Sequence, residues 1–229
     1  MSEELPTIKT IGIIGGTGKE GKGLAYRWLK AGYRVLIGSR QIEKAAAAAD
    51  ELCTLAGGDV EVIGMTNAEA AEKADLVVLT VPYTAHRQTL EGLVGHLDGK
   101  ILVSATVPII PPKVTRVQMP PDGSAALEAQ SILGEAVQVV AAFQSVSHER
   151  LLNNEDVGCD VLVSGSGKSA RSLVLKLVRD AGMVGYDAGP IENSAAVEGL
   201  AAVLIGINKQ FGVKSAGIKI IGLPIEASQ

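Results

Sequence analysis

A glycine-rich turn near the start of the chain restricts the possible folds more than any other feature. Residues 15–23 read Gly-Gly-Thr-Gly-Lys-Glu-Gly-Lys-Gly and directly follow the apolar run Thr10–Ile14. Within them Gly16, Gly18 and Gly21 have the G-x-G-x-x-G spacing of dinucleotide-binding proteins. Such glycines allow a tight strand-to-helix turn and close approach of a pyrophosphate, which the N–H groups of the next helix then bind. The sequence therefore predicts a dinucleotide-binding fold.

A nucleoside-triphosphate P-loop is a competing interpretation of the same glycines. Residues 16–22 match most of that motif, but it continues with a serine or threonine whose hydroxyl binds magnesium. This chain has Gly23 at that position. A second near match ends at residues 165–168 and has Leu162 in place of its first glycine. We therefore reject the P-loop, and a plain glycine turn without a ligand is the simpler alternative.

Short β-branched runs alternate with longer helix-forming segments, which is typical of a parallel sheet covered by helices. Strands are expected at residues 10–14, 34–38, 60–64, 76–81, 101–105, 137–142, 160–165 and 184–187. Helices are expected at 21–31, 42–56, 67–73, 84–97, 168–181 and 193–212. We expect an α/β, Rossmann-type doubly wound, mostly parallel sheet in residues 1–190. Residues 191–229 are expected to form a small helical domain that packs on the sheet or on a second subunit.

Composition and charge exclude several functional classes. The net charge of −4 argues against nucleic acid as the principal partner. Cys53 and Cys159 are far apart and form no metal or redox pair, so reduced thiols are expected. The first residues are acidic where a signal peptide is basic, and no apolar stretch approaches the roughly 20 residues of a membrane span. We expect a soluble cytoplasmic protein without a metal or a membrane partner.

The residues after the second expected strand indicate which nicotinamide cofactor binds. NAD-binding proteins usually have an acidic residue there that holds the ribose 2′-hydroxyl. This chain has Gly38, Ser39 and Arg40, with Lys44 one helical turn later. A hydroxyl and two cations suit a 2′-phosphate, which an acidic residue would repel. Ordinary surface charges are the alternative, but cations are not favoured at a helix start unless an anion is present. We therefore expect NADP(H).

These residues, together with others along nearly the whole chain, resemble the NADPH-dependent reductases of coenzyme F420. The similar segments are residues 13–18, 22–25, 38–40 with Lys44, 75–82, 187–190 with Asn193 and Ser194, and 217–219. The resemblance implies reversible hydride transfer between NADP(H) and the deazaflavin F420. It also implies a two-domain subunit and a homodimer.

The resemblance further implies individual binding residues. For NADP(H) these are Thr17, Gly18, Lys19 and Glu20 at the pyrophosphate, with Gly16 and Gly21 in the same turn, Ser39, Arg40 and Lys44 at the 2′-phosphate, and Val81 and Val107 at the nicotinamide half. For the deazaflavin they are Ala142, Gln144, Val146, His148 and Ala216.

One departure from the family concerns the acceptor. A family member has a histidine where this chain has Gln144, and a proline and an alanine in place of Ser147 and His148. Gln144 can still hydrogen-bond to a ring carbonyl but cannot carry a proton charge. The departure weakens the assignment of the acceptor and leaves that of NADP(H) unaffected.

The expected chemistry requires no catalytic side chain. Direct hydride transfer needs nicotinamide C4 held about 3–3.5 Å from the acceptor carbon, in a site that excludes water. His86 and His96 are expected on helix surfaces, and His148 near the cofactor crevice. Tyr83 either flanks the nicotinamide or packs under the next helix. A further set of cations either meets the anionic tail of F420 or forms a solvated basic face: Lys209, Lys214 and Lys219.

Two other functions are compatible with the sequence. One is an NADPH-dependent reductase of another acceptor, such as a flavin, a metal complex or a small imine, which Gln144 and the scarcity of aromatic residues favour. A non-catalytic NADP(H) sensor is the alternative from a different class. It would be favoured by an apolar face on the C-terminal helix that a homodimer does not cover.

Overall fold

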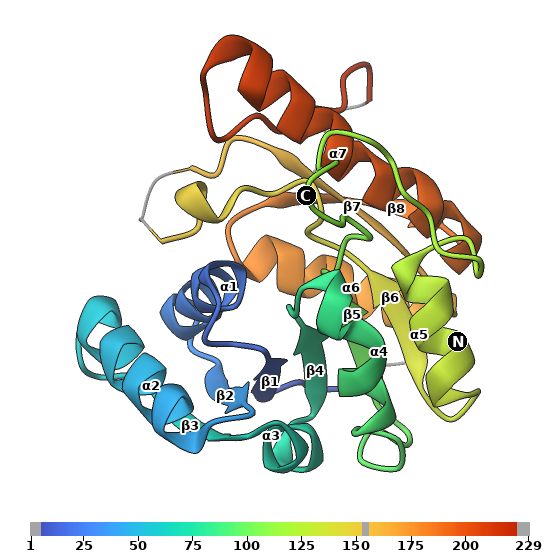
Figure 1. Cartoon of the computed structure of the whole chain (residues 1–229). Helices are drawn as coiled ribbons and strands as arrows, with labels where there is room; N and C mark the ends of the chain where they lie inside the picture. Colours follow the sequence, from blue (N-terminus) through green and yellow to red (C-terminus); the bar gives the residue numbers. More distant parts are fainter. Residues whose placement is uncertain (1–5, 153–155, 224–229) are drawn as a thin grey trace.

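The computed structural model describes residues 6–152 and 156–223. These form one eight-stranded sheet in the order β3-β2-β1-β4-β5-β6-β7-β8 (Figure 1). The strands are β1 (Thr10–Ile14), β2 (Arg34–Ser39), β3 (Val62–Thr66), β4 (Leu76–Leu79), β5 (Ile101–Ser104), β6 (Gln138–Ala141), β7 (Asp160–Gly165) and β8 (Val184–Gly189). Only β6 and β7 pair antiparallel; the other neighbours in this sheet are parallel. The predicted Rossmann-type, mostly parallel sheet is confirmed.

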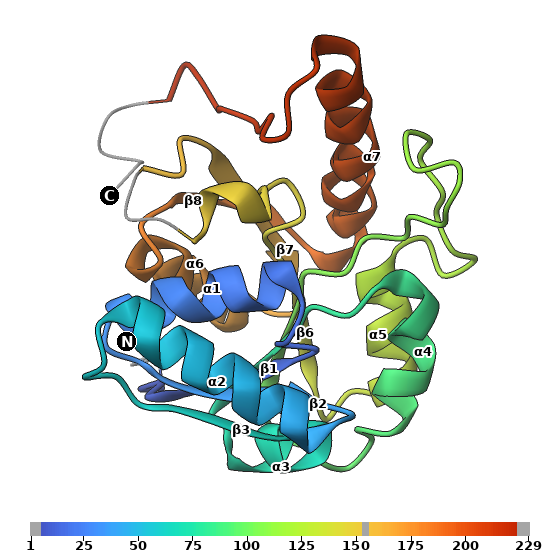
Figure 2. The ribbon, with the colours of Figure 1, turned by 60° about the vertical axis from the view of Figure 1, so that its left-hand side comes forward.

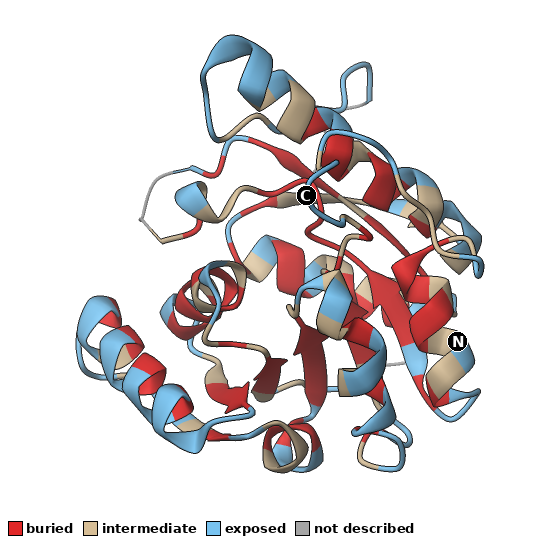
Figure 3. Cartoon of the chain, viewed as in Figure 1, coloured by how far each residue is buried: buried red, intermediate tan, exposed pale blue. Residues whose placement is uncertain are grey.

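Helices cover both faces of the sheet. They are α1 (Lys19–Lys30), α2 (Ile42–Ala56), α3 (Asn67–Lys73), α4 (Tyr83–Glu91), α5 (Ala125–Leu133), α6 (Lys168–Asp180) and α7 (Ser194–Phe211), with 3₁₀ turns η1 (His148–Arg150) and η2 (Ile191–Asn193). Buried side chains of α1, α2 and α6 form one core layer, and those of α3, α4 and α5 form the other. Figure 3 shows the buried residues concentrated on the strands and the inner helix faces. No helix in the described part of the chain has the length and apolar character to cross a membrane.

Most elements lie where the sequence predicted them, and three differ. The helix expected at residues 84–97 ends at Glu91, because Gly92 and then Gly95, with φ of +82°, interrupt it. Strand β3 lies two residues later than expected. Helix α5 was not predicted, although Ser124 caps it by accepting the N–H of Leu127. The domain division at residue 190 falls between β8 and η2 and stays a prediction.

The C-terminal segment is fastened to the sheet through one buried carboxylate. Asp160, only 2% exposed at the start of β7, accepts hydrogen bonds from Lys219 Nζ at 3.0 Å and from the backbone N–H of Ile220 at 2.7 Å. Its own backbone N–H donates to the carbonyl of Ile218. Closer to α7, the N–H of Ala216 donates to the side-chain oxygen of Asn208 on that helix, at 2.9 Å. The segment therefore runs back beside α7 toward the sheet (Figure 2).

Helix α7 is joined to α5 by a second buried carboxylate. Glu198 is 1% exposed, and its oxygens accept the backbone N–H groups of Ala125 at 2.7 Å and Ala126 at 3.0 Å. These are first-turn N–H groups of α5, which have no partner within that helix. Burial raises the pKa of Glu198 to about 7, although the two N–H bonds act in the opposite direction.

The raised pKa of Glu198 predicts how stability changes with pH. The ordinary value is 4.5, so the folded state holds a proton that the unfolded state releases between about pH 4.5 and 7. This contribution to stability is therefore complete below pH 4.5 and is lost as the pH rises to 7, by at most about 1.4 kcal/mol per pH unit. We expect Glu198→Gln to lose this component of the pH dependence in urea denaturation measured from pH 5 to 8.

Glu192→Gln provides the matched control, because Glu192 is exposed on the neighbouring η2. Its stability profile should run parallel to that of the wild type. If the stability of Glu198→Gln changed with pH in parallel with that of the wild type, the raised pKa assigned to Glu198 would be wrong.

Candidate cofactor and acceptor site

The glycine-rich turn brings the start of α1 directly against the sheet. The N–H of Gly16 donates to the carbonyls of Ile13 and Gly38, at 3.2 and 3.1 Å. A Cβ on Gly21 would lie 2.7 Å from the Cα of Gly16 and 2.8 Å from Thr80 Oγ1, so only glycine fits there. No side chain caps the helix at its N-cap residue, Gly18. The free N–H groups of the first turn are therefore available to an anion.

A groove of about 370 Å³ extends from this turn along the carboxyl ends of β1, β2 and β4. The predicted NADP(H) residues in its wall are Thr17, Gly18, Lys19, Glu20, Ser39, Arg40, Lys44 and Val81. Gly16 and Gly21 are buried beneath the groove and shape the turn without lining it. In the described part of the chain, neither Arg40 nor Lys44 forms a salt bridge. Two cations thus stand exposed beside the Ser39 hydroxyl, as a phosphate site requires.

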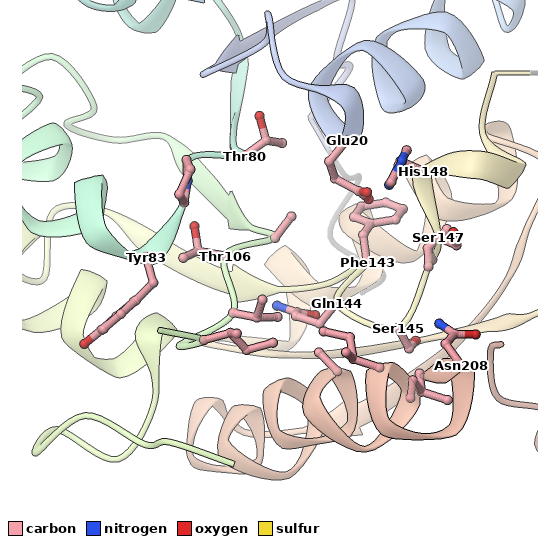
Figure 4. Close-up of a pocket in the computed structure, with 18 of the residues that line it drawn as sticks. Glu20, Thr80, Tyr83, Thr106, Phe143, Gln144, Ser145, Ser147, His148 and Asn208 are labelled. Atoms are coloured by element: carbon pink, nitrogen blue, oxygen red, sulfur yellow. The ribbon is translucent and has the colours of Figure 1, made fainter. Parts of the chain in front are cut away.

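A second cavity, of about 660 Å³, lies between the strand ends and α7 (Figure 4). The predicted residues that line it are Glu20, Val81, Val107, Gln144, Val146, His148 and Ala216. Ala142 is fully buried behind this wall, so the structure does not place it in the cavity. The groove and the cavity share four lining residues: Glu20, Thr80, Val81 and Pro82. A ligand in the groove and a ligand in the cavity would therefore meet at the end of β4.

Sequence reasoning missed the wall that α7 contributes to the cavity. Its lining residues are Ala201, Leu204, Ile205 and Asn208. Their spacing of three to four residues marks one helical face and is the signal that could have identified them. Thr106, adjacent to the predicted Val107, was missed as well; its hydroxyl donates to the carbonyl of Val81 at 3.2 Å.

Gln144 is held in one orientation in the cavity wall. Its Nε2 donates to the carbonyl of Ser104 at 2.7 Å, while its buried Oε1 has no hydrogen-bond partner in the described part of the chain. The carbonyl of Ser104 can only accept, so the nitrogen must face it. Gln144 therefore offers an acceptor oxygen to a ligand N–H. The predicted bond to a ring carbonyl would have to use the second amide hydrogen.

The residue before Gln144 has an unusual backbone conformation. Phe143 has a φ of +76°, a left-handed conformation that costs a bulky residue on the order of 1–3 kcal/mol. Its ring packs edge-on against the buried Trp28 of α1, with the ring centroids 5.7 Å apart. This contact places Phe143 beside Glu20 at the junction of the groove and the cavity (Figure 4).

The histidine predictions are partly wrong. His86 is 1% exposed, not a surface residue, because α4 packs against α5 and turns this side chain inward. Its ring stacks on Tyr83, and its Nδ1 lies 3.4 Å from Glu128 Oε2 without hydrogen-bond geometry. Burial lowers the pKa of His86. His96 is partly exposed beyond the end of α4 and contacts Glu72 at 2.7 Å.

Tyr83 is the first residue of α4, which corresponds to the helix expected to follow it, and it lines the cavity. Its hydroxyl donates to Glu128 Oε2 of α5 at 3.0 Å, so the side chain is held against a helix that was not predicted, and its contact with the nicotinamide stays a prediction. Glu128 in turn binds Arg87 at 2.7 Å. This carboxylate could not be identified from the sequence, because helix α5 was not predicted.

The three lysines after residue 208 are not equivalent. Lys219 forms a salt bridge with Asp160, Lys209 is exposed near the end of α7, and Lys214 lines the cavity. Only Lys214 is thus positioned to meet a ligand there. Among the described residues, no group of three or more potential ligand side chains is arranged to hold a metal ion.

Comparison with known proteins relates this geometry to a family. Residues 10–108 match the family model described as NADP oxidoreductase, coenzyme F420-dependent. The F420-dependent NADP reductase of Methanocaldococcus jannaschii is 40% identical over 223 residues, covering 94% of this chain and 99% of the relative. That of Methanothermobacter thermautotrophicus is also 40% identical, over 95% of this chain and 97% of the relative.

A solved structure supports the same fold. The crystal structure of a candidate F420-dependent NADP reductase from Arthrobacter sp. FB24 has a TM-score of 0.80 and 22% sequence identity. It covers 94% of this chain and 100% of its own. With similarity of 40% over almost the full length of two named relatives, this chain belongs to the F420-dependent NADP reductase family.

Proposed function

We propose that this protein transfers a hydride reversibly between NADP(H) and coenzyme F420. The observation that carries the proposal is the meeting of two cavities at the end of β4. One has the glycine turn and the unpaired cations of a dinucleotide site, and the other has room for a second ring system. The full-length similarity to reductases of that name supports the identity of both substrates.

In the groove, the chain's own residues would hold NADP(H) by its charged groups. The first-turn N–H groups of α1 would bind the pyrophosphate, and Arg40, Lys44 and the hydroxyl of Ser39 the 2′-phosphate. Val81 and, from the adjoining cavity, Val107 would pack against the nicotinamide half. The acidic residue typical of NAD-binding proteins is absent after β2, which favours the phosphorylated cofactor.

In the cavity, mostly apolar walls would hold a planar ring and exclude water. Val146 and Ala216 would contact its surface, and Gln144 Oε1 would accept a hydrogen bond from a ring N–H. His148 and Lys214 lie at the same cavity and would face polar parts of the substrate. NADPH supplies the hydride, so the task of the protein is to orient two rings and to keep water out.

We propose that the protein is cytoplasmic and that it forms a homodimer. In this proposal the two subunits contact each other through α7. Val203, Ile207 and Phe211 lie four residues apart on α7 and are 49%, 38% and 69% exposed. They form an apolar stripe that runs beside the row of cavity residues on that helix. In this proposal residues 191–229 act as a small domain that closes one side of the acceptor cavity and also binds the partner subunit.

The proposed reaction predicts loss of the oxidised deazaflavin absorbance band when NADPH and F420 are mixed anaerobically with the protein. NADH should serve poorly in its place. Tight NADPH binding without reduction of F420 would contradict the proposal and leave a different acceptor or a sensor. Reduction of a flavin or an imine in preference to F420 would identify the reductase alternative.

Arg40→Ala should raise the KM for NADPH about 10- to 100-fold, since hydrogen bonds to charged groups contribute roughly 1.5–3 kcal/mol. The kcat should change little, because the 2′-phosphate is remote from the reacting ring. Steady-state kinetics with NADPH and NADH provide the measurement, and the KM for NADH should not rise. Arg179→Ala, at the exposed end of α6, is the control. A KM for NADPH equal to that of the wild type would remove Arg40 from the site.

Phe211→Glu combined with Ile207→Glu should convert the proposed dimer into a monomer, because two charges would be buried in an apolar interface. Sedimentation velocity measures the change directly. Leu55→Glu alters a similarly exposed apolar residue on α2 and should leave the dimer intact. A monomeric wild-type protein would disprove the proposed assembly.

A further inference from the structure

A buried carboxyl group stands at the junction of the groove and the cavity. Glu20 belongs to the first turn of α1 and lines both spaces. Its Oε1 is buried and has no hydrogen-bond partner among the residues that the structure describes. Figure 4 shows the side chain extending toward the Phe143 ring, with His148 of η1 on its other side. The close contact of Gly23 with Leu151 confirms that α1 and η1 are packed together here.

The cations of α1 do not compensate a negative charge on Glu20. Lys22 is bound to both carboxylate oxygens of Glu51 at 2.9 Å. Arg27 donates to the carbonyls of Leu151 and Arg150, at 2.9 and 2.8 Å. Lys19 is exposed at the rim of the groove. Burial raises the pKa of Glu20 to about 8.

The other elements around Glu20 contribute few charges. His148 comes from η1, Tyr83 from the start of α4, and Lys214 from the segment after α7, and all three line the cavity. The Tyr83 hydroxyl is engaged with Glu128, and burial raises its pKa to about 12, so it stays neutral. In the groove, Arg40 and Lys44 follow the end of β2 at Ser39.

Cofactor binding would add negative charge next to this carboxyl. Glu20 follows Gly18 by two residues, so its backbone N–H is among the free donors that would bind the pyrophosphate. An ionised carboxylate in the same buried turn would repel that anion and would have no donor of its own. The neutral acid avoids both costs and gains a hydroxyl that can donate a hydrogen bond.

We propose that Glu20 binds the nicotinamide cofactor as the neutral carboxylic acid and donates a hydrogen bond to it at the junction of the two cavities. The inference rests on the NADP(H) part of the proposed function. Above neutral pH the free protein releases this proton, so NADPH binding takes one up. Glu20 thereby makes the affinity for the cofactor depend on pH, an effect that the glycines and cations of the site do not produce.

Isothermal titration calorimetry with NADPH tests the inference, in pairs of buffers that differ in ionisation enthalpy. With a pKa of about 8, the wild type should take up about 0.1 proton per NADPH at pH 7 and about 0.9 at pH 9. Its affinity should fall about tenfold over this range. The 2′-phosphate, with a second pKa near 6, is already ionised throughout.

Glu20→Gln keeps the shape and a donor but holds no titrating proton. This variant should bind NADPH without proton uptake and with equal affinity at both pH values, so that it binds more tightly than the wild type at pH 9. Glu135→Gln, an exposed carboxyl before β6, should behave as the wild type does.

Two outcomes would overturn the inference while leaving the proposed function intact: NADPH binding by the wild type at pH 9 without proton uptake, or an unchanged pH dependence in Glu20→Gln. The first needs no variant, so a Glu20→Gln protein that failed to fold would not prevent the test. A wild type that does not bind NADPH at all would overturn the proposed function, and this inference with it.

Discussion

The whole site depends on the absence of side-chain volume where α1 begins against the sheet. A single Cβ on Gly21 would collide with the backbone of Gly16 and with Thr80 at the end of β4. Without it, the helix starts at the strand ends, and its free N–H groups open into the groove. The same contact brings Glu20 to the end of β4, which is where the groove and the acceptor cavity meet. In the proposed function, packing at this one crossing therefore determines where both substrates would bind.

The parallel half of the sheet was readable from sequence because each of its elements has a local signal. Strand β4 is apolar throughout and buried on both faces, and α2 begins and ends at the residues predicted. Helix α4 was predicted too long, because Gly95 has a positive φ that a periodicity argument does not detect. Helix α5 was missed because it follows a long irregular segment, and its first turn is bound by Glu198 from far along the chain.

The two parts of the candidate site also differ in how far the sequence identifies their residues. The groove is built from consecutive residues at two strand ends, so a motif could locate Thr17, Arg40 and their neighbours. The cavity gathers side chains from segments more than a hundred residues apart, and a motif cannot report such proximity. Burial is equally invisible in sequence: His86 looked like a surface residue, and Ala142 like a contact residue, until the packing around them was known.

Of the described residues, the groove and the cavity share Glu20, Thr80, Val81 and Pro82 alone, and this narrow overlap has an evolutionary consequence. With NADP(H) in the groove and the acceptor in the cavity, as proposed, changes in α7 or in residues 143–148 would alter the acceptor wall without altering the residues that bind the nucleotide. One lineage could then exchange its electron acceptor while keeping its electron donor. The four shared residues would be the exception, since a substitution there would affect the binding of both ligands at once, and they should drift most slowly as such a family diversifies.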